Sequence, residues 1–331
     1  MGASLASGGR MKAAVVHGPG KVVLTSTDVP TVGPGEVLLR LEGCGVCGSS
    51  APVWAGRPWF DYPQPPGAPG HEGWGRVAAV GDDVAGVAVG DRVAALSYRA
   101  HAEYDVAKAD QLVILPPSLD GVAVPGEALA CAVNIFRRSG IEEGHTVAIV
   151  GIGFLGALLV RLASQAGAQV IAITRREFAL DMARRFGATH AIVMDDHWRI
   201  LEVVRELTAG RWCERVIEAV GAQWPLDLAG ELTGERGRLV IAGFHQDGPR
   251  QFQSCRFTWR GIDVVNAHER DPVRYVDGMR RAVELMATGA LDPTPLFTHR
   301  VDLPDLGRAM DLMQSRPDGF MKALVTTGYG Q

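Results

Sequence analysis

The sequence predicts an α/β protein that combines an irregular barrel of short strands with a doubly wound parallel sheet. Two textures along the 331 residues carry this prediction. From residue 11 to 133, short β-branched runs alternate with glycine and proline, which is typical of strands joined by turns. From residue 134 to 267, apolar strands alternate with helical stretches, which predicts a parallel sheet covered by helices.

The two ends of the chain complete this division. Residues 1–10 are small and polar and precede a second plausible start at Met11, so we expect a tag or disordered leader there. After residue 267 we expect a long helix from Tyr275 to Thr288, a short helix and a closing strand. We therefore assign residues 268–331 to the first domain, into which residues 134–267 are inserted.

The composition excludes several classes of partner. The formal charge is −4, from 33 basic and 37 acidic residues, without the basic excess that nucleic acid or an anionic membrane selects. No apolar run approaches the roughly 20 residues that span a bilayer, and no signal peptide is recognisable. The five cysteines are too few and too scattered for a disulfide framework. We expect a cytoplasmic protein with no nucleic-acid or membrane partner.

The stretch VAIVGIGFLG predicts a dinucleotide site in the inserted domain. Its glycines form G-x-G-x-x-G directly after an expected strand and at the start of a helix. Such glycines allow a tight turn and the approach of a pyrophosphate, which the helix amino terminus then faces. The residues expected to bind the cofactor here are Gly151, Gly153, Phe154, Leu155 and Gly156.

The next strand, QVIAIT, ends in Thr174, which is followed by Arg175 and Arg176. No carboxylate stands at this strand end to bind the ribose hydroxyls or to repel a 2′-phosphate. The two arginines instead offer planar donors suited to phosphate. We therefore expect NADP(H) to be preferred over NAD(H); the alternative is a pair of solvated arginines at a helix start.

Four separated motifs follow one another along the chain: GVCGS, GHE, GDRV and the glycine-rich motif. Their order resembles the medium-chain dehydrogenase/reductase family, in its zinc-dependent alcohol and polyol dehydrogenase branch, over nearly the whole chain from Met11. The resemblance implies a GroES-like catalytic domain, a Rossmann domain with a nicotinamide cofactor, and a catalytic zinc held by Cys47 and His71. It also implies hydride transfer between the nicotinamide cofactor and an alcohol or polyol, or the corresponding aldehyde or ketone, in a homodimer or homotetramer.

The chemistry of Cys44 and Cys47 supports the zinc assignment independently. Their C-x-x-C spacing also occurs in redox dithiols, but glycines crowd this motif, and a structural zinc site would need a second cysteine pair nearby. A catalytic zinc needs about three ligands of mixed sulfur, nitrogen and oxygen type and one open position. Cys47 and His71 supply two ligands, and the four-cysteine structural zinc lobe of the family is missing.

The third zinc ligand stays open between Glu127 and Cys131, in PGEALACAVNIF. Glu127 matches a carboxylate of the polyol dehydrogenases and Cys131 a cysteine ligand of the alcohol dehydrogenases. We favour Glu127, as a ligand or as the holder of a zinc-bound water, with Cys131 as a small buried hydrophobe. Glu72 resembles the family glutamate close to the zinc, which exchanges with water as a ligand.

Three further residues take their interpretation from the resemblance. Ser49 matches the hydroxyl that passes a proton between substrate and solvent, and Lys322 matches a basic residue that meets the cofactor pyrophosphate. Ser50 departs from the family, which usually has an aspartate there to orient the histidine ligand. The alternatives are a zinc-free quinone or enoyl reductase of the same fold and a nucleotide-binding protein without catalysis, which Ser50 favours.

Overall fold

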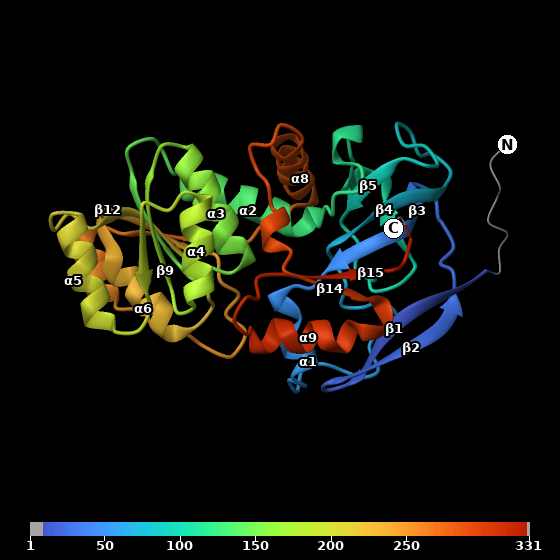
Figure 1. The fold of residues 1–331 in the computed structure, drawn as a ribbon, viewed down its shortest axis with the longest axis horizontal. Coiled ribbons are helices and arrows are strands. Elements are labelled where there is room, and N and C mark those ends of the chain that lie inside the picture. The colour runs from blue at the N-terminus through green and yellow to red at the C-terminus, as the bar shows by residue number, and fades with distance from the viewer. Residues whose placement is uncertain (1–8, 330–331) are drawn as a thin grey trace. The chain divides into compact units, whose positions relative to one another are not determined.

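The computed structural model describes residues 9–329, which divide into two compact units (Figure 1). The first unit consists of the chain up to Ala130 and the chain from Asp271 onward, and the second of Cys131–Arg270. Most of the expected leader, residues 1–8, lies outside the described residues. The first strand begins at Arg10, inside the expected leader, because Arg10 pairs with Asp28 of the next strand.

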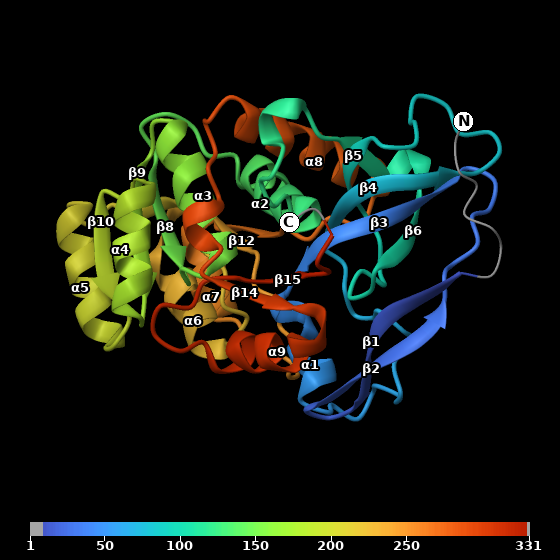
Figure 2. The ribbon, with the colours of Figure 1, turned by 45° about the vertical axis from the view of Figure 1, so that its right-hand side comes forward.

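The first unit is built on antiparallel strands, with one parallel pair, β14 and β15. One sheet has the order β14-β15-β3-β4-β5-β7 with β6 paired to β3, and β1 and β2 form a separate ribbon (Figure 2). The strands are β1 (Arg10–Gly18), β2 (Lys21–Asp28), β3 (Glu36–Gly45), β4 (Gly73–Val80), β5 (Arg92–Ala95), β6 (Tyr104–Lys108), β7 (Leu112–Ile114), β14 (His299–Asp302) and β15 (Ala323–Thr326).

Both segments of the first unit contribute helices. They are α1 (Ala51–Trp54), the start of α2 (Gly126–Ser139), α8 (Pro272–Ala287) and α9 (Leu306–Ser315). The start of α8 follows from its sequence, because the Asp271 carboxylate accepts a hydrogen bond from Val273 N at 3.0 Å and Pro272 occupies the first turn. The helix begins slightly before the Tyr275 start expected from the sequence.

The second unit is a six-stranded parallel sheet with the order β10-β9-β8-β11-β12-β13. The β8 side chains of Val147 to Val150 are fully buried, as a strand covered on both faces requires. Because the strand order reverses beside β8, a crevice is expected at the carboxyl ends of β8 and β11. The strands are β8 (Thr146–Val150), β9 (Gln169–Thr174), β10 (His190–Val193), β11 (Cys213–Glu218), β12 (Thr233–Ile241) and β13 (Asp263–Asn266).

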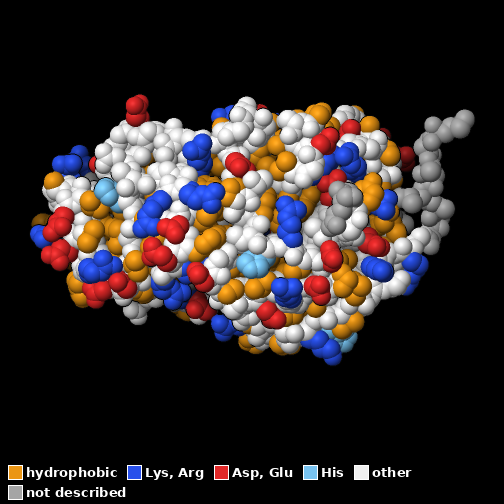
Figure 3. Space-filling model, in the orientation of Figure 1, with side chains coloured by type: hydrophobic (Ala, Val, Ile, Leu, Met, Phe, Trp, Pro, Cys, Tyr) orange, Lys and Arg blue, Asp and Glu red, His pale blue; other side chains and the backbone are white. Residues whose placement is uncertain are grey.

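Helices connect these parallel strands, with α3 packed on α4 and α5 on α6. They are α3 (Phe154–Gln165), α4 (Glu177–Phe186), α5 (His197–Leu207), α6 (Gln223–Leu232) and α7 (Ser254–Arg260). Within residues 9–329, no helix is both long and apolar enough to cross a membrane. Basic and acidic side chains intermingle on the face drawn in Figure 3.

The arginine of the GDRV motif ties the sheet of the first unit together. Arg92, whose side chain is 4% exposed, donates to the Glu42 carboxylate at 2.8 Å. It also donates to the carbonyl oxygens of Leu119 and Val122, each at 2.7 Å. A guanidinium buried this deeply is tolerated because a carboxylate and two carbonyl oxygens accept its hydrogen bonds.

We expect Arg92→Ala to destabilise the protein by about 3–5 kcal/mol, because Glu42 and two carbonyl oxygens lose their buried donor. Arg76→Ala is the control, since its side chain is 40% exposed and lies 3.6 Å from the same carboxylate. The control should cost less than about 1 kcal/mol. Urea unfolding measures both, and equal midpoints for the two variants would contradict the prediction.

Candidate active site

Three side chains that can bind a metal come together in the first unit. The ligand atoms of Cys47, His71 and Glu72 all lie within 4.8 Å of one another. Strand pairing explains this, because Cys44 near the end of β3 pairs with Gly73 at the start of antiparallel β4. The residues just after β3 and just before β4 therefore meet. The two motifs GVCGS and GHE form one site in this way.

The imidazole of His71 is held by the backbone. Its Nδ1 lies 2.8 Å from the carbonyl oxygen of Pro69. A carbonyl oxygen can only accept, so Nδ1 carries a hydrogen and Nε2 is the atom left for a metal. The Pro69 carbonyl thus supplies the orienting acceptor that the family's aspartate provides at the position of Ser50. The imidazole is therefore oriented even though Ser50 replaces the aspartate.

The charges around His71 favour a cation. Burial alone would lower its pKa, but the Cys47 sulfur raises it, and so do the carboxylates of Glu127 and Glu72, bringing the pKa to about 10. One sulfur, one imidazole nitrogen and carboxylate oxygens are the donor types that zinc takes in catalytic sites. The residues present fit zinc.

Glu72 forms a buried ion pair with Lys322. The Lys322 Nζ donates a hydrogen bond to Oε1 of Glu72 at 2.6 Å and lies 2.5 Å from Oε2. Burial alone would lower the Lys322 pKa, but the negative charge of Glu72 raises it. A Cβ at Gly45 would lie 1.8 Å from Oε2, so only glycine leaves room for this carboxylate. The contact of Lys322 with a pyrophosphate stays a prediction.

Glu127 and Cys131 lie on α2, and neither belongs to the group of three. The Glu127 carboxylate accepts a hydrogen bond from the Tyr275 hydroxyl at 2.5 Å. Burial raises the Glu127 pKa, and the charges of His71 and Glu72 also act on it, in opposite directions. Glu127 therefore lies within electrostatic reach of the group. No sequence motif identified Tyr275, which follows Glu127 by 148 positions.

Ser49 lies on the metal-facing side of the imidazole. Its hydroxyl is 3.4 Å from His71 Nε2, and its backbone N–H donates to the Cys47 sulfur at 3.5 Å. A hydroxyl both donates and accepts, so Ser49 can exchange a proton with a group bound next to Nε2.

The glycine-rich turn of the second unit has the geometry that a dinucleotide needs. Gly151 has a φ of 101°, in the region that favours glycine. A Cβ at Gly156 would lie 2.1 Å from Gly151 O, so the helix can approach the turn only without a side chain. At Gly153, by contrast, no described atom beyond its neighbours lies within 4 Å of a Cβ position. The space over Gly153 is open for a ligand.

The helix α3 begins directly after Gly153, with Phe154 buried and Leu155 half-buried in its first turn. The N-cap residue of this helix is Gly153, which has no side chain to cap the first backbone N–H groups. Anions bind at such helix starts. The turn and the helix start therefore fit a pyrophosphate.

The residues after β9 lie beside the same turn. Thr174 is buried at the strand end, whereas Arg175 is exposed and Arg176 half-buried. Arg176 donates to the carbonyl oxygen of Ile152 at 3.4 Å, which places it next to the glycine-rich turn.

A buried carboxylate that the sequence did not point to lies at the end of β11. Glu218 accepts hydrogen bonds at 2.8 Å from Val220 N and from Gly221 N, and it lies 3.0 Å from His245 Nε2. A Cβ at Gly151 would meet Val220 at 2.5 Å. Glu218 thus fixes the loop against which the glycine-rich turn packs. An acidic residue ending a buried strand was the available signal.

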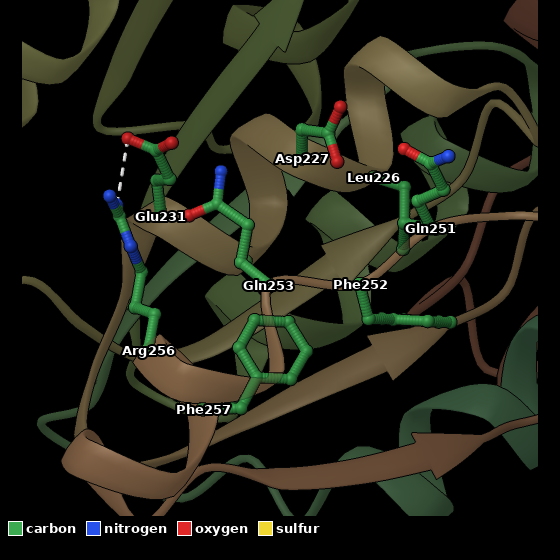
Figure 4. A pocket seen from close by; sticks show the side chains of 9 residues that line it. Leu226, Asp227, Glu231, Gln251, Phe252, Gln253, Arg256 and Phe257 are labelled. Carbon is green, nitrogen blue, oxygen red and sulfur yellow. Dashed lines mark ion pairs between the residues drawn. The ribbon is translucent and has the colours of Figure 1, made fainter.

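Two cavities lie away from the metal-binding group and the glycine-rich turn. One in the second unit has a volume of about 10 Å³, bordered by the Arg256–Glu231 ion pair, and admits only a water molecule (Figure 4). The other, of about 460 Å³ in the first unit, is lined by charges of both signs, including Glu42, Arg300 and Asp302. Neither has the donor set of a catalytic centre.

Two family models match the chain. One, described as an alcohol dehydrogenase GroES-like domain, matches residues 33–135, and one described as a zinc-binding dehydrogenase matches residues 155–287. The fold and the site define an oxidoreductase of the dehydrogenase class. The chain belongs to the zinc-dependent alcohol dehydrogenase branch of the medium-chain dehydrogenase/reductase family.

Known proteins of similar sequence and structure agree. L-threonine 3-dehydrogenase of Bacillus subtilis (strain 168) is 26% identical, with 93% of this chain and 96% of the relative covered. Sorbitol dehydrogenase of Homo sapiens is 28% identical over 87% of this chain and 88% of its own. The structure of a candidate zinc-binding dehydrogenase from Sinorhizobium meliloti 1021, bound to NADP, has a TM-score of 0.82 at 28% identity, covering 96% and 99%.

These similarities confirm the predicted family, the predicted fold class and the predicted class of activity. A zinc-binding family and a relative that binds NADP also support a zinc ion and a nucleotide cofactor for this chain.

Two glycine substitutions separate ligand binding from folding. Gly153→Ala should fold normally, because its Cβ enters open space, yet bind both NADH and NADPH at least about tenfold more weakly, or ~1.4 kcal/mol. Gly156→Ala should instead lose about 1–3 kcal/mol of stability through the contact with Gly151 O. Fluorescence titration and thermal unfolding measure the two effects. Normal cofactor affinity in Gly153→Ala would contradict the assignment.

Proposed function

We propose that this protein transfers a hydride between NADP(H) and a small alcohol or polyol, or the corresponding aldehyde or ketone. The observation that supports it most is the group formed by Cys47, His71 and Glu72, with ligand atoms within 4.8 Å. The relatives named for sorbitol and L-threonine support a small hydroxyl-bearing substrate. A homodimer or homotetramer and a cytoplasmic location stay predictions.

Zinc would be held by Cys47 and His71 together with one carboxylate. Glu72 is our choice for the third ligand, because its oxygen lies with the other two, whereas Glu127 and Cys131 lie outside the group. The Lys322 ammonium shares the charge of Glu72, which makes this carboxylate a weak ligand that can exchange with water.

When bound, zinc supplies a Lewis acid at the substrate oxygen, and the nicotinamide exchanges the hydride. The residues of the chain handle the proton and the orientation. Ser49, next to His71 Nε2, would pass the proton between the substrate hydroxyl and solvent. The Glu127 carboxylate would accept a hydrogen bond from a hydroxyl group at the open position and so orient it.

Purified protein should contain about one zinc per chain, and Cys47→Ala or His71→Ala should lose both the metal and the activity. Cys44→Ala is the matched control, because Cys44 belongs to the same C-x-x-C motif but packs in the core with its thiol donating to Gly45 O. It should keep the zinc. Elemental analysis and turnover with alcohols, polyols and carbonyls measure these outcomes. Full activity in metal-free protein would refute the proposed zinc site.

The preference for NADP(H) would come from Arg175 and Arg176, beside the glycine-rich turn. A hydrogen bond to a charged group contributes about 1.5–3 kcal/mol, which corresponds to a discrimination of about tenfold to a hundredfold. The strand end offers no carboxylate that would repel the 2′-phosphate.

Replacing Arg175 and Arg176 together by alanine should lower kcat/KM for NADPH by about tenfold to a hundredfold and leave NADH nearly unchanged. The double alanine variant at Arg184 and Arg185 is the control, since it removes the same charge from the other end of α4. A wild type that prefers NADH, or an equal loss for both cofactors, would show that Arg175 and Arg176 are only solvated.

A further inference from the structure

We infer that Tyr275 is a positioning residue for this reaction, whose hydroxyl fixes the Glu127 carboxylate beside the metal-binding group. The inference rests on the proposed function and adds a residue that no sequence motif identified. The contact is direct: the Tyr275 hydroxyl donates to Glu127 Oε1 at 2.5 Å, and Tyr275 is 9% exposed.

The backbone holds Tyr275 in place. It lies in the first turn of α8, where its N–H donates to the Asp271 carbonyl oxygen at 2.9 Å. The Asp271 side chain and Pro272 fix where that turn begins. The ring therefore leaves α8 at a position set by the helix start rather than by a mobile loop.

The start of α2 can approach Met279 of α8 closely because residue 126 is a glycine. A Cβ at Gly126 would lie 2.9 Å from Met279 Sδ and 2.7 Å from Ala94 Cβ. Met279 is fully buried and follows Tyr275 by one helical turn, on the same face. Glu127, the residue after Gly126, is thereby placed opposite the Tyr275 ring. The hydrogen bond thus lies beside the close approach of Gly126 to Met279.

The chemistry of the pair explains the consequence for the site. A phenol hydroxyl donates one hydrogen, and the carboxylate oxygen Oε1 accepts it. A glutamate side chain has several rotamers to lose on burial, and a short hydrogen bond selects one of them. Tyr275 thus holds Glu127 in one orientation within electrostatic reach of His71 and Glu72.

Tyr275→Phe removes only the hydroxyl. Tyr62→Phe is the matched control, because the Tyr62 hydroxyl also donates one hydrogen bond, to the backbone carbonyl of Val53. We expect Tyr275→Phe to lower kcat, or the zinc affinity measured by chelator competition, by about tenfold to a hundredfold. It should also change the visible absorption of the cobalt-loaded protein, which reports the surroundings of the metal. Tyr62→Phe should change none of these by more than about twofold.

A double-mutant cycle decides whether Tyr275 acts through Glu127. In the Glu127→Ala background, Tyr275→Phe should have no further effect on kcat, zinc affinity or the cobalt spectrum. The inference is overturned if Tyr275→Phe behaves like Tyr62→Phe, or if its effect persists without Glu127. A wild type that takes up no zinc and turns over no substrate contradicts the proposed function, and the inference falls with it. A zinc-binding, active wild type with an unaffected Tyr275→Phe contradicts the inference alone.

Discussion

The antiparallel pairing of β3 with β4 is the constraint on which the candidate metal centre depends. It places the residue after one strand next to the residue before the other, so two short motifs become one set of ligands. The pairing in turn depends on absent side chains. A Cβ at Gly43 would lie 2.6 Å from the Trp74 ring, and one at Gly75 would lie 2.2 Å from Arg40 O. The glycines around the cysteines are therefore requirements of strand packing.

The second constraint is electrostatic. The centre gathers the half-buried Cys47 sulfur and the fully buried Glu72 carboxylate, with the half-buried Glu127 carboxylate within electrostatic reach, and this costs free energy unless positive charge accompanies it. Lys322 supplies one positive charge directly on Glu72. Because the lysine neutralises only one carboxylate, the centre keeps an attraction for a further cation. Charge therefore favours a cation at this place on the sheet.

The sequence predicted the features that depend on neighbouring residues. The turn around Gly151, the helix after it and the strand end at Thr174 are local patterns, and the two-part fold followed from their alternation. Tyr275 and the Pro69 carbonyl could not be read in this way. Tyr275 lies 148 positions from Glu127 and belongs to no motif. The Pro69 carbonyl is a backbone group, and the residue type does not predict its contacts.

Lys322 illustrates the same limit. The sequence marked it as a functional cation, but its contact with Glu72 joins residues 250 positions apart and depends on how β15 closes onto β3. Glu127 and Cys131 were both kept as candidates because they occur in one helix with suitable donor atoms. Only packing could show which carboxylate has an oxygen within 4.8 Å of ligand atoms of both Cys47 and His71, and among the described residues it is Glu72.

The division of the first unit into two segments determines when during synthesis the centre can form. The second unit is continuous, from Cys131 to Arg270, and can fold while the ribosome is still adding residues. The contacts of Glu72 and Glu127 form later, because their partners Lys322 and Tyr275 are translated after that unit. A chain released early therefore contains the nucleotide-binding turn but lacks the cation that balances its buried carboxylate. Completion of translation, rather than the arrival of the cysteine and histidine, is the event that assembles the catalytic centre.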